Sequence, residues 1–107
     1  MANSDSNREV WDTKLSTDSE LQFKVAMRRN KILGQWVADQ LKLEGDAAND
    51  VIDKVIKSDF EETGDEDVIR GVRKIFEMSG VDVEETVIRS QLGKAHGEAV
   101  EQFKKAD

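Results

Sequence analysis

The sequence contains no cysteine, no proline and only one histidine. Without cysteine the chain forms neither disulfides nor thiolate metal sites, and without proline nothing obliges a helix to stop once it has begun. No apolar run approaches the roughly 20 residues that span a bilayer, and the start lacks the apolar core of a signal peptide. We therefore expect a cytoplasmic protein without direct membrane insertion.

Acidic residues outnumber basic ones, giving a formal net charge of −7 over 107 residues. This charge argues against binding to nucleic acid and against adsorption to anionic membranes, so the partner is expected to be a protein. The sequence has no Gly-rich phosphate loop, no nucleophile beside a base and no ligand set for zinc. A single-domain binding or regulatory protein, with no catalytic residues, no metal and no cofactor, is the resulting expectation.

Beyond residue 18, apolar residues recur at helical spacing, and Gly45, Gly64 and Gly80 separate the segments. This pattern predicts an all-α fold, a compact four-helix bundle with short turns. The predicted helices span about residues 19–43, 46–63, 65–79 and 82–105. We expect Gly45 to stop the first helix, and Asp46, Asp65 and Asp82 to cap the next three.

The first 18 residues form a polar stretch that nevertheless carries Val10, Trp11 and Leu15. Ser6 and Glu9 match a capping box, and Trp11 and Leu15 would share one face of the helix that follows. A helix this short is marginal alone, so we expect a flexible segment, residues 1–18, that folds on a partner and precedes a bundle domain, residues 19–107. The alternative is a frayed terminus whose indole rests against the domain.

Arg29 and Asp59 both fall on apolar stripes, where a charge needs a partner. We therefore predict a structural ion pair between them, because a buried ion left alone is costly. His96 is expected to be a structural histidine, and Gly93 and Gly97 to lie on the face opposite the stripe of their helix. The carboxylates around Gly64 are expected to be surface and cap residues: Glu61, Glu62, Asp65, Glu66 and Asp67.

A basic cluster on the first predicted helix offers a second kind of function. Lys24, Arg28 and Lys31, with Trp36 nearby, form a candidate site for adenine nucleotides. A charge cluster of this kind more commonly forms a solvated face. A nucleotide-binding sensor and a passive assembly subunit therefore remain alternatives to a regulatory protein that acts through its N-terminal segment.

Two long motifs resemble one known family. The first is the run from Glu20 to Trp36, which contains Phe23, Lys24, Arg28, Arg29, Asn30, Lys31, Leu33 and Gly34. The second comprises Gly45 to Ala47, Asp59 to Glu62, Gly64 to Val68, Gly80 to Val83, and Ile88 with Arg89. Both are similar to the zeta subunit, the ATPase inhibitor of the F-type ATP synthase in bacteria related to the mitochondrial ancestor.

The resemblance implies a mobile N-terminal segment on a four-helix bundle that is a monomer when free. In that family the segment enters a catalytic interface of the synthase head, formed by the alpha, beta and gamma subunits, and blocks ATP hydrolysis while largely sparing synthesis. The protein would thus lie at the inner membrane, peripherally, through the synthase. Weak ATP or ADP binding by the bundle is also implied. The candidate inhibitory residues are Arg8, Glu9, Val10, Trp11, Lys14 and Leu15.

Overall fold

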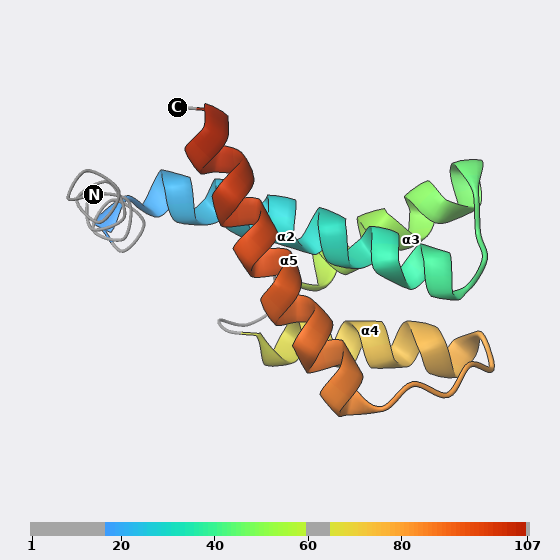
Figure 1. Cartoon of the computed structure of the whole chain (residues 1–107). Helices are drawn as coiled ribbons and strands as arrows, with labels where there is room; N and C mark the ends of the chain where they lie inside the picture. Colours follow the sequence, from blue (N-terminus) through green and yellow to red (C-terminus); the bar gives the residue numbers. More distant parts are fainter. Residues whose placement is uncertain (1–16, 60–64, 107) are drawn as a thin grey trace.

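A computed structural model describes residues 17–59 and 65–106 (Figure 1). Within these ranges the chain forms four α-helices and no strand: α2 (Ser19–Gln40), α3 (Gly45–Ser58), α4 (Glu66–Met78) and α5 (Glu85–Ala106). The predicted all-α fold and four-helix bundle are confirmed. No described helix combines the length and the apolar character that a bilayer crossing requires.

Helix α2 is the central element of the bundle. It packs against both α3 and α5, and α4 contacts the same two helices from the other side. In Figure 1, α5 crosses α2 at a steep angle, while α3 returns alongside α2 after a tight turn. The two ends of α2 lie on opposite sides of the molecule.

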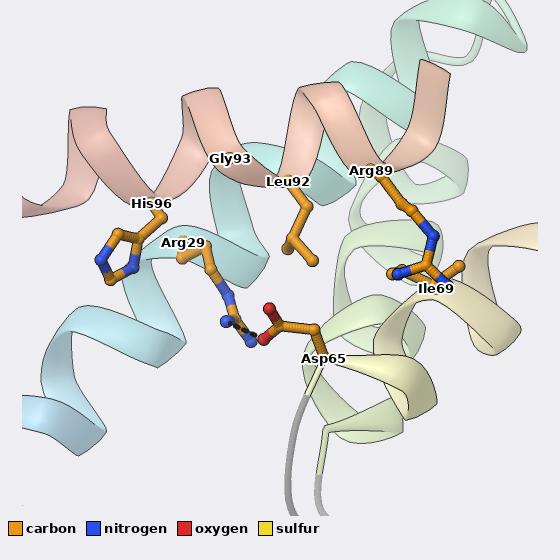
Figure 2. Close-up of a pocket in the computed structure, with 7 residues that line it drawn as sticks. All are labelled: Arg29, Asp65, Ile69, Arg89, Leu92, Gly93 and His96. Atoms are coloured by element: carbon orange, nitrogen blue, oxygen red, sulfur yellow. Dashed lines mark hydrogen bonds and ion pairs between the residues drawn. The ribbon is translucent and has the colours of Figure 1, made fainter. Parts of the chain in front are cut away.

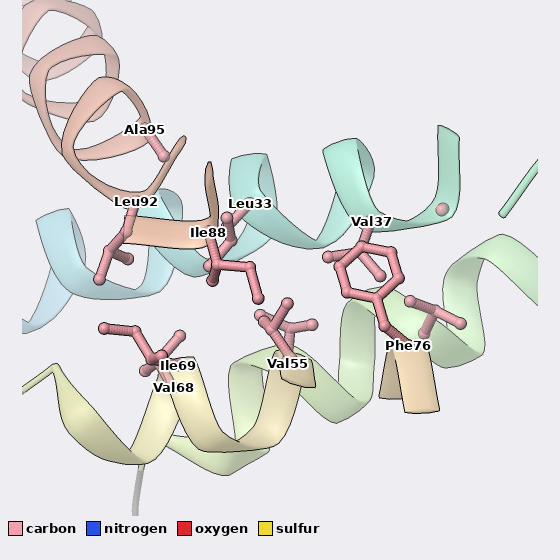
Figure 3. Packing of buried hydrophobic residues seen from close by; sticks show 12 residues of the cluster. Leu33, Val37, Val55, Val68, Ile69, Phe76, Ile88, Leu92 and Ala95 are labelled. Carbon is pink, nitrogen blue, oxygen red and sulfur yellow. The ribbon is translucent and has the colours of Figure 1, made fainter. Parts of the chain in front are cut away.

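The core is formed by the apolar stripes of all four helices (Figure 3). Leu33, Val37, Val55, Val72 and Ile88 are completely shielded from solvent. These residues lie on the apolar stripes predicted from helical periodicity, so the prediction that these stripes form the core is confirmed. Trp36 and Ile75 are partly buried and pack at the edge of the core.

The first helix ends earlier than predicted, at Gln40 instead of about residue 43. Lys42 adopts a left-handed backbone with φ of 58°, which helical residues cannot have. The amide of Leu43 then donates to the carbonyl of Ala38, and the amide of Lys42 to that of Asp39. These are the two bonds of a Schellman motif, a role that glycine usually takes. The prediction that Gly45 stops the helix is therefore wrong; Gly45 is the first residue of α3.

Of the other boundaries, the end of α3 differs most from the prediction, because the helix ends at Ser58 instead of about residue 63. Helix α4 ends as predicted before Gly80, whose φ of 72° supports a second Schellman motif, with Val81 N–H donating to the carbonyl of Phe76. Helix α5 begins at Glu85, three residues after the predicted start, because Val81 and Val83 pack against the core before the helix begins. Asp46 does not cap α3; Glu44 occupies that position without a side-chain cap.

Two glycines allow α3 to approach its neighbours closely. A Cβ atom at Gly34 would lie 2.8 Å from the Cα of Ile52, and one at Gly71 would lie 2.7 Å from the Cβ of Ser58. Both distances are shorter than carbon atoms tolerate, so any larger side chain would push the helices apart. The close α2–α3 contact at Gly34 fixes the position of Arg29 relative to the end of α3.

Candidate functional site

Arg29 projects from the buried face of α2, and only 9% of the residue is exposed. Its Nη2 lies 3.2 Å from Asp59 Oδ2 at the end of α3, which is the ion pair predicted from the sequence. Its Nη1 lies 2.9 Å from Asp65 Oδ1 at the start of α4. One guanidinium thus connects three helices.

Asn30 completes the network from the next position of α2. It is 1% exposed, accepts a hydrogen bond from Arg29 Nε at 2.9 Å and donates one to Asp59 Oδ2 at 3.0 Å. All three nitrogens of Arg29 therefore donate to side chains of this protein. Such saturation of the donors indicates a structural role, since buried charges are tolerated only when they are paired and hydrogen-bonded.

The contact between Asp65 and Arg29 was not predicted from the sequence. The prediction placed Asp65 among surface and cap residues, and it does occupy the N-cap position of α4. Its side chain, however, makes no capping bond and is turned toward Arg29 instead (Figure 2). A cap residue and an ion-pair partner have the same sequence signature, so no local signal distinguishes them.

The prediction that Asp67 lies at the surface is also wrong. This residue is 5% exposed, and neither carboxylate oxygen has a hydrogen-bond partner among the described residues. Arg70 Nη1 lies 3.4 Å from Asp67 Oδ1, one helical turn along. The position of Asp67 in the first turn of α4 gives it the favourable N-terminal end of the helix dipole. Glu61 and Glu62, from the same cluster, lie outside the described residues.

A cavity of about 330 Å³ lies beside the network, between α2, α4 and α5 (Figure 2). Arg29, Asp65 and Arg89 form its polar wall. His96 and Gly93 line it from α5, and Ile69 and Leu92 form its apolar side. Gly93 and Gly97 are exposed, and a Cβ at either would meet no atom within 4 Å.

Exposed ion pairs join α4 to α5 at the rim of this cavity. Arg89 lies 2.9 Å from Glu66 and 3.1 Å from Glu85, which also pairs with Arg73 at 3.0 Å. The hydrogen bond from Arg89 holds the pKa of Glu66 below its ordinary value, and the two carboxylates raise the pKa of Arg89. Because these groups face solvent, the pairs orient the helices and add little stability.

The structure spreads the four nucleotide candidates along α2. Lys24 Nζ lies 3.3 Å from Glu20, and Arg28 donates to Gln102 at 2.7 Å and lies over the ring of Phe103. Trp36 packs edge-on against Phe76, with ring centroids 5.7 Å apart. Lys31 is exposed. The described cavity between α2, α4 and α5 includes none of the four in its lining.

The candidate inhibitory residues lie outside the described residues: Arg8, Glu9, Val10, Trp11, Lys14 and Leu15. What the structure does describe is the point where that segment joins the bundle. Asp18 has an extended backbone, with φ of −96° and ψ of 102°, and its side chain accepts a hydrogen bond from Leu21 N–H. This N-cap marks a defined start of α2.

The charged groups of the described residues form no cluster suited to a metal ion. Within residues 17–59 and 65–106, no three or more His, Asp or Glu side chains gather to hold a metal ion. The charged cluster around Arg29 is instead satisfied internally. Its effect is to fix the ends of α3 and α4 against α2.

Comparison with known proteins gives one family. The model of the family described as ATPase inhibitor subunit zeta matches residues 1–102. The match includes the polar N-terminal segment, all of α2 to α4, and α5 as far as residue 102. A search of curated proteins found no match.

Proposed function

The chain belongs to the ATPase inhibitor subunit zeta family, and from this premise we propose that its first 18 residues block ATP hydrolysis by an F-type ATP synthase. The family match carries the proposal, because it covers the N-terminal segment together with the bundle. The segment would enter a catalytic interface of the synthase head, among the alpha, beta and gamma subunits. In this proposal the protein regulates an enzyme and has no catalytic residues of its own.

The composition of the N-terminal residues, compared with the helices that follow, supports this proposal. The core that the structure describes is assembled from α2 to α5, and Asp18 caps the start of that unit. Val10, Trp11 and Leu15 precede the cap in a stretch that is otherwise rich in Ser, Asn and Asp. Apolar side chains in such a stretch are suited to becoming buried in a partner.

Inhibition would follow the helix-in-groove mode of recognition, coupled to folding of the segment. Trp11 and Leu15 would share one face of the helix and be the desolvated anchors, with Val10 beside them. Arg8, Glu9 and Lys14 would lie at the polar rim, where charges mainly set orientation and association rate. Rotation in the hydrolysis direction would tighten the interface around the helix, whereas rotation in the synthesis direction would open it.

Alanine at Trp11 or at Leu15 is expected to weaken inhibition strongly. Truncating a buried anchor costs about 2 kcal/mol or more, which corresponds to a roughly 30-fold higher concentration for half-maximal inhibition. ATP hydrolysis by an activated synthase head, titrated with each variant, measures this change. Val87→Ala is the matched control, since Val87 is a 40% exposed apolar residue of α5.

Two outcomes of this titration would contradict parts of the proposal. Equal inhibition by Trp11→Ala, Leu15→Ala and the wild type would contradict the assignment of the anchors. A wild type that does not inhibit would contradict the proposed function itself. In that case a nucleotide-induced change in the amide signals of Lys24, Arg28 and Lys31 would support the sensor alternative, and its absence would leave the assembly alternative.

A further inference from the structure

A second surface of the bundle has the features of a protein-binding groove. It is a cavity of about 540 Å³ between the α2–α3 turn, α3 and α4. Its lining is mostly apolar, and Lys54 and Lys74 are its charged residues; we call it the lysine-flanked groove. The apolar lining residues are Leu41, Leu43, Val51, Ile75 and Met78.

Met78 distinguishes this groove from an ordinary packing defect. Its side chain is 79% exposed, the largest value among the exposed large hydrophobic residues that the structure describes. Methionine side chains adapt to many shapes and are common at binding surfaces. An exposed methionine beside an open apolar groove is therefore available for contact with another molecule.

The two lysines indicate the charge of the molecule that fits the groove. Lys54 on α3 and Lys74 on α4 have no carboxylate partner among the described residues, whereas neighbouring Lys57 pairs with Asp53 at 2.9 Å. On a chain of net charge −7, two unpaired cations beside one groove form a local positive site. Carboxylates of a partner would complement them.

The N-terminal segment of the same chain is not suited to fill the groove. Helix α2 has 22 residues and is about 33 Å long, and the lining residues Leu41 and Leu43 follow its far end. Trp11 precedes Ser19 by eight residues, so it reaches about 29 Å from Ser19 when fully extended and about 12 Å when helical. A helical segment thus leaves Trp11 well short of the end of the groove at Leu41.

We propose that the lysine-flanked groove binds an amphipathic helix of the ATPase that the chain inhibits, with apolar side chains in the groove and carboxylates beside Lys54 and Lys74. The proposal rests on the proposed function, because it assigns the groove to the same partner. The N-terminal segment and the groove then hold the partner at opposite ends of α2. Two linked contacts raise affinity, since the second forms at a high effective concentration once the first is made.

The test uses the full-length chain with the double substitution Lys54→Glu and Lys74→Glu. Its matched control is Lys94→Glu with Lys105→Glu, two exposed lysines of α5 that likewise have no described carboxylate partner and give the same net charge. Binding to an immobilised synthase head is measured directly, alongside inhibition of ATP hydrolysis. We expect the groove variant to bind about tenfold more weakly, mostly through slower association, with unchanged inhibition at saturation. The control should remain within about twofold of the wild type.

A further variant shows whether weaker binding comes from the groove itself and not from misfolding of the double variant. Met78→Ser leaves the charges intact and changes only an exposed side chain, and it too should weaken binding severalfold. Groove variants that bind like the wild type would overturn the proposal. Analytical ultracentrifugation of the free chain gives a second test. If the wild type is a dimer and a groove substitution makes it a monomer, the groove binds a second copy of the chain and the proposal is overturned.

The outcomes separate this proposal from the proposed function. A wild type that binds the head without inhibiting it would refute the inhibitory role, while the loss of binding in the groove variant would still support the groove. A wild type that inhibits, together with groove variants that bind and inhibit at the same concentrations as the wild type, would refute the groove and still support the inhibitory role. A wild type that neither binds nor inhibits would refute both.

Discussion

Removal of residues 1–18 is expected to abolish inhibition of ATP hydrolysis while the four helices remain folded. The described core is formed by side chains of α2 to α5, with Leu33 and Val55 at its centre and completely shielded. The shortened chain should therefore keep its helical circular dichroism and unfold cooperatively. Among the hydrogen bonds described above, it would lose the one that Asp18 accepts as the N-cap of α2, which costs about 1 kcal/mol.

The matched control keeps the cap and removes only the segment before it. A chain that starts at Thr17 retains the hydrogen bond from Leu21 N–H to Asp18. It should be as stable as the full chain and as inactive as the shorter one. Inhibition by this chain at the concentration that suffices for the full chain would show that the bundle, not the segment, is the effector.

Substitution of Arg29 by methionine is expected to cost about 3 kcal/mol of folding free energy, the lower end of the range for breaking a buried ion pair. The change leaves Asp59, whose side chain is 20% exposed, without its guanidinium, and it leaves the buried Asn30 Oδ1 without a donor. The side chain of Asp65 is 60% exposed, so water can solvate its carboxylate when Arg29 is removed. The loss of folding free energy is therefore not expected to exceed about 3 kcal/mol. Urea unfolding followed by circular dichroism measures the loss.

Arg89→Met is the matched control for Arg29→Met. Both arginines have two carboxylate partners, but the side chain of Arg89 is 42% exposed, compared with 10% for Arg29. Exposed pairs contribute about 1 kcal/mol or less, so the Arg89 variant should be nearly as stable as the wild type. Similar losses in the two variants would contradict the view that burial makes the Arg29 network important.

Helical periodicity in the sequence was sufficient to predict four helices and most of the core. The spacing of Val68, Ile69, Val72 and Phe76, for example, places all four on the buried face of α4. The end of α2 could not be predicted, because Lys42 occupies a left-handed position that favours glycine, and Gly45 is only three residues away. The preference of glycine for left-handed backbone predicts the turn at Gly45 instead of Lys42.

The ion pair between Arg29 and Asp59 could be predicted because both residues interrupt apolar stripes, and a buried charge requires a partner. The contributions of Asn30 and Asp65 depend on how α2, α3 and α4 approach one another. That approach is set by Gly34 and Gly71, whose contacts with α3 involve residues distant in the sequence. The lysine-flanked groove likewise combines residues of three segments, so no single stretch of sequence indicates it.

The insertion of the N-terminal segment into a catalytic interface is the central claim, and site-specific photo-crosslinking tests it most directly. A photoreactive side chain replaces Trp11 in one full-length variant and Lys94 of α5 in another, and each is irradiated with the synthase head during ATP hydrolysis. We predict crosslinks from position 11 to both alpha and beta subunits that disappear when excess unlabelled chain competes. Inhibition by the position 11 variant without any crosslink to those subunits would contradict the account.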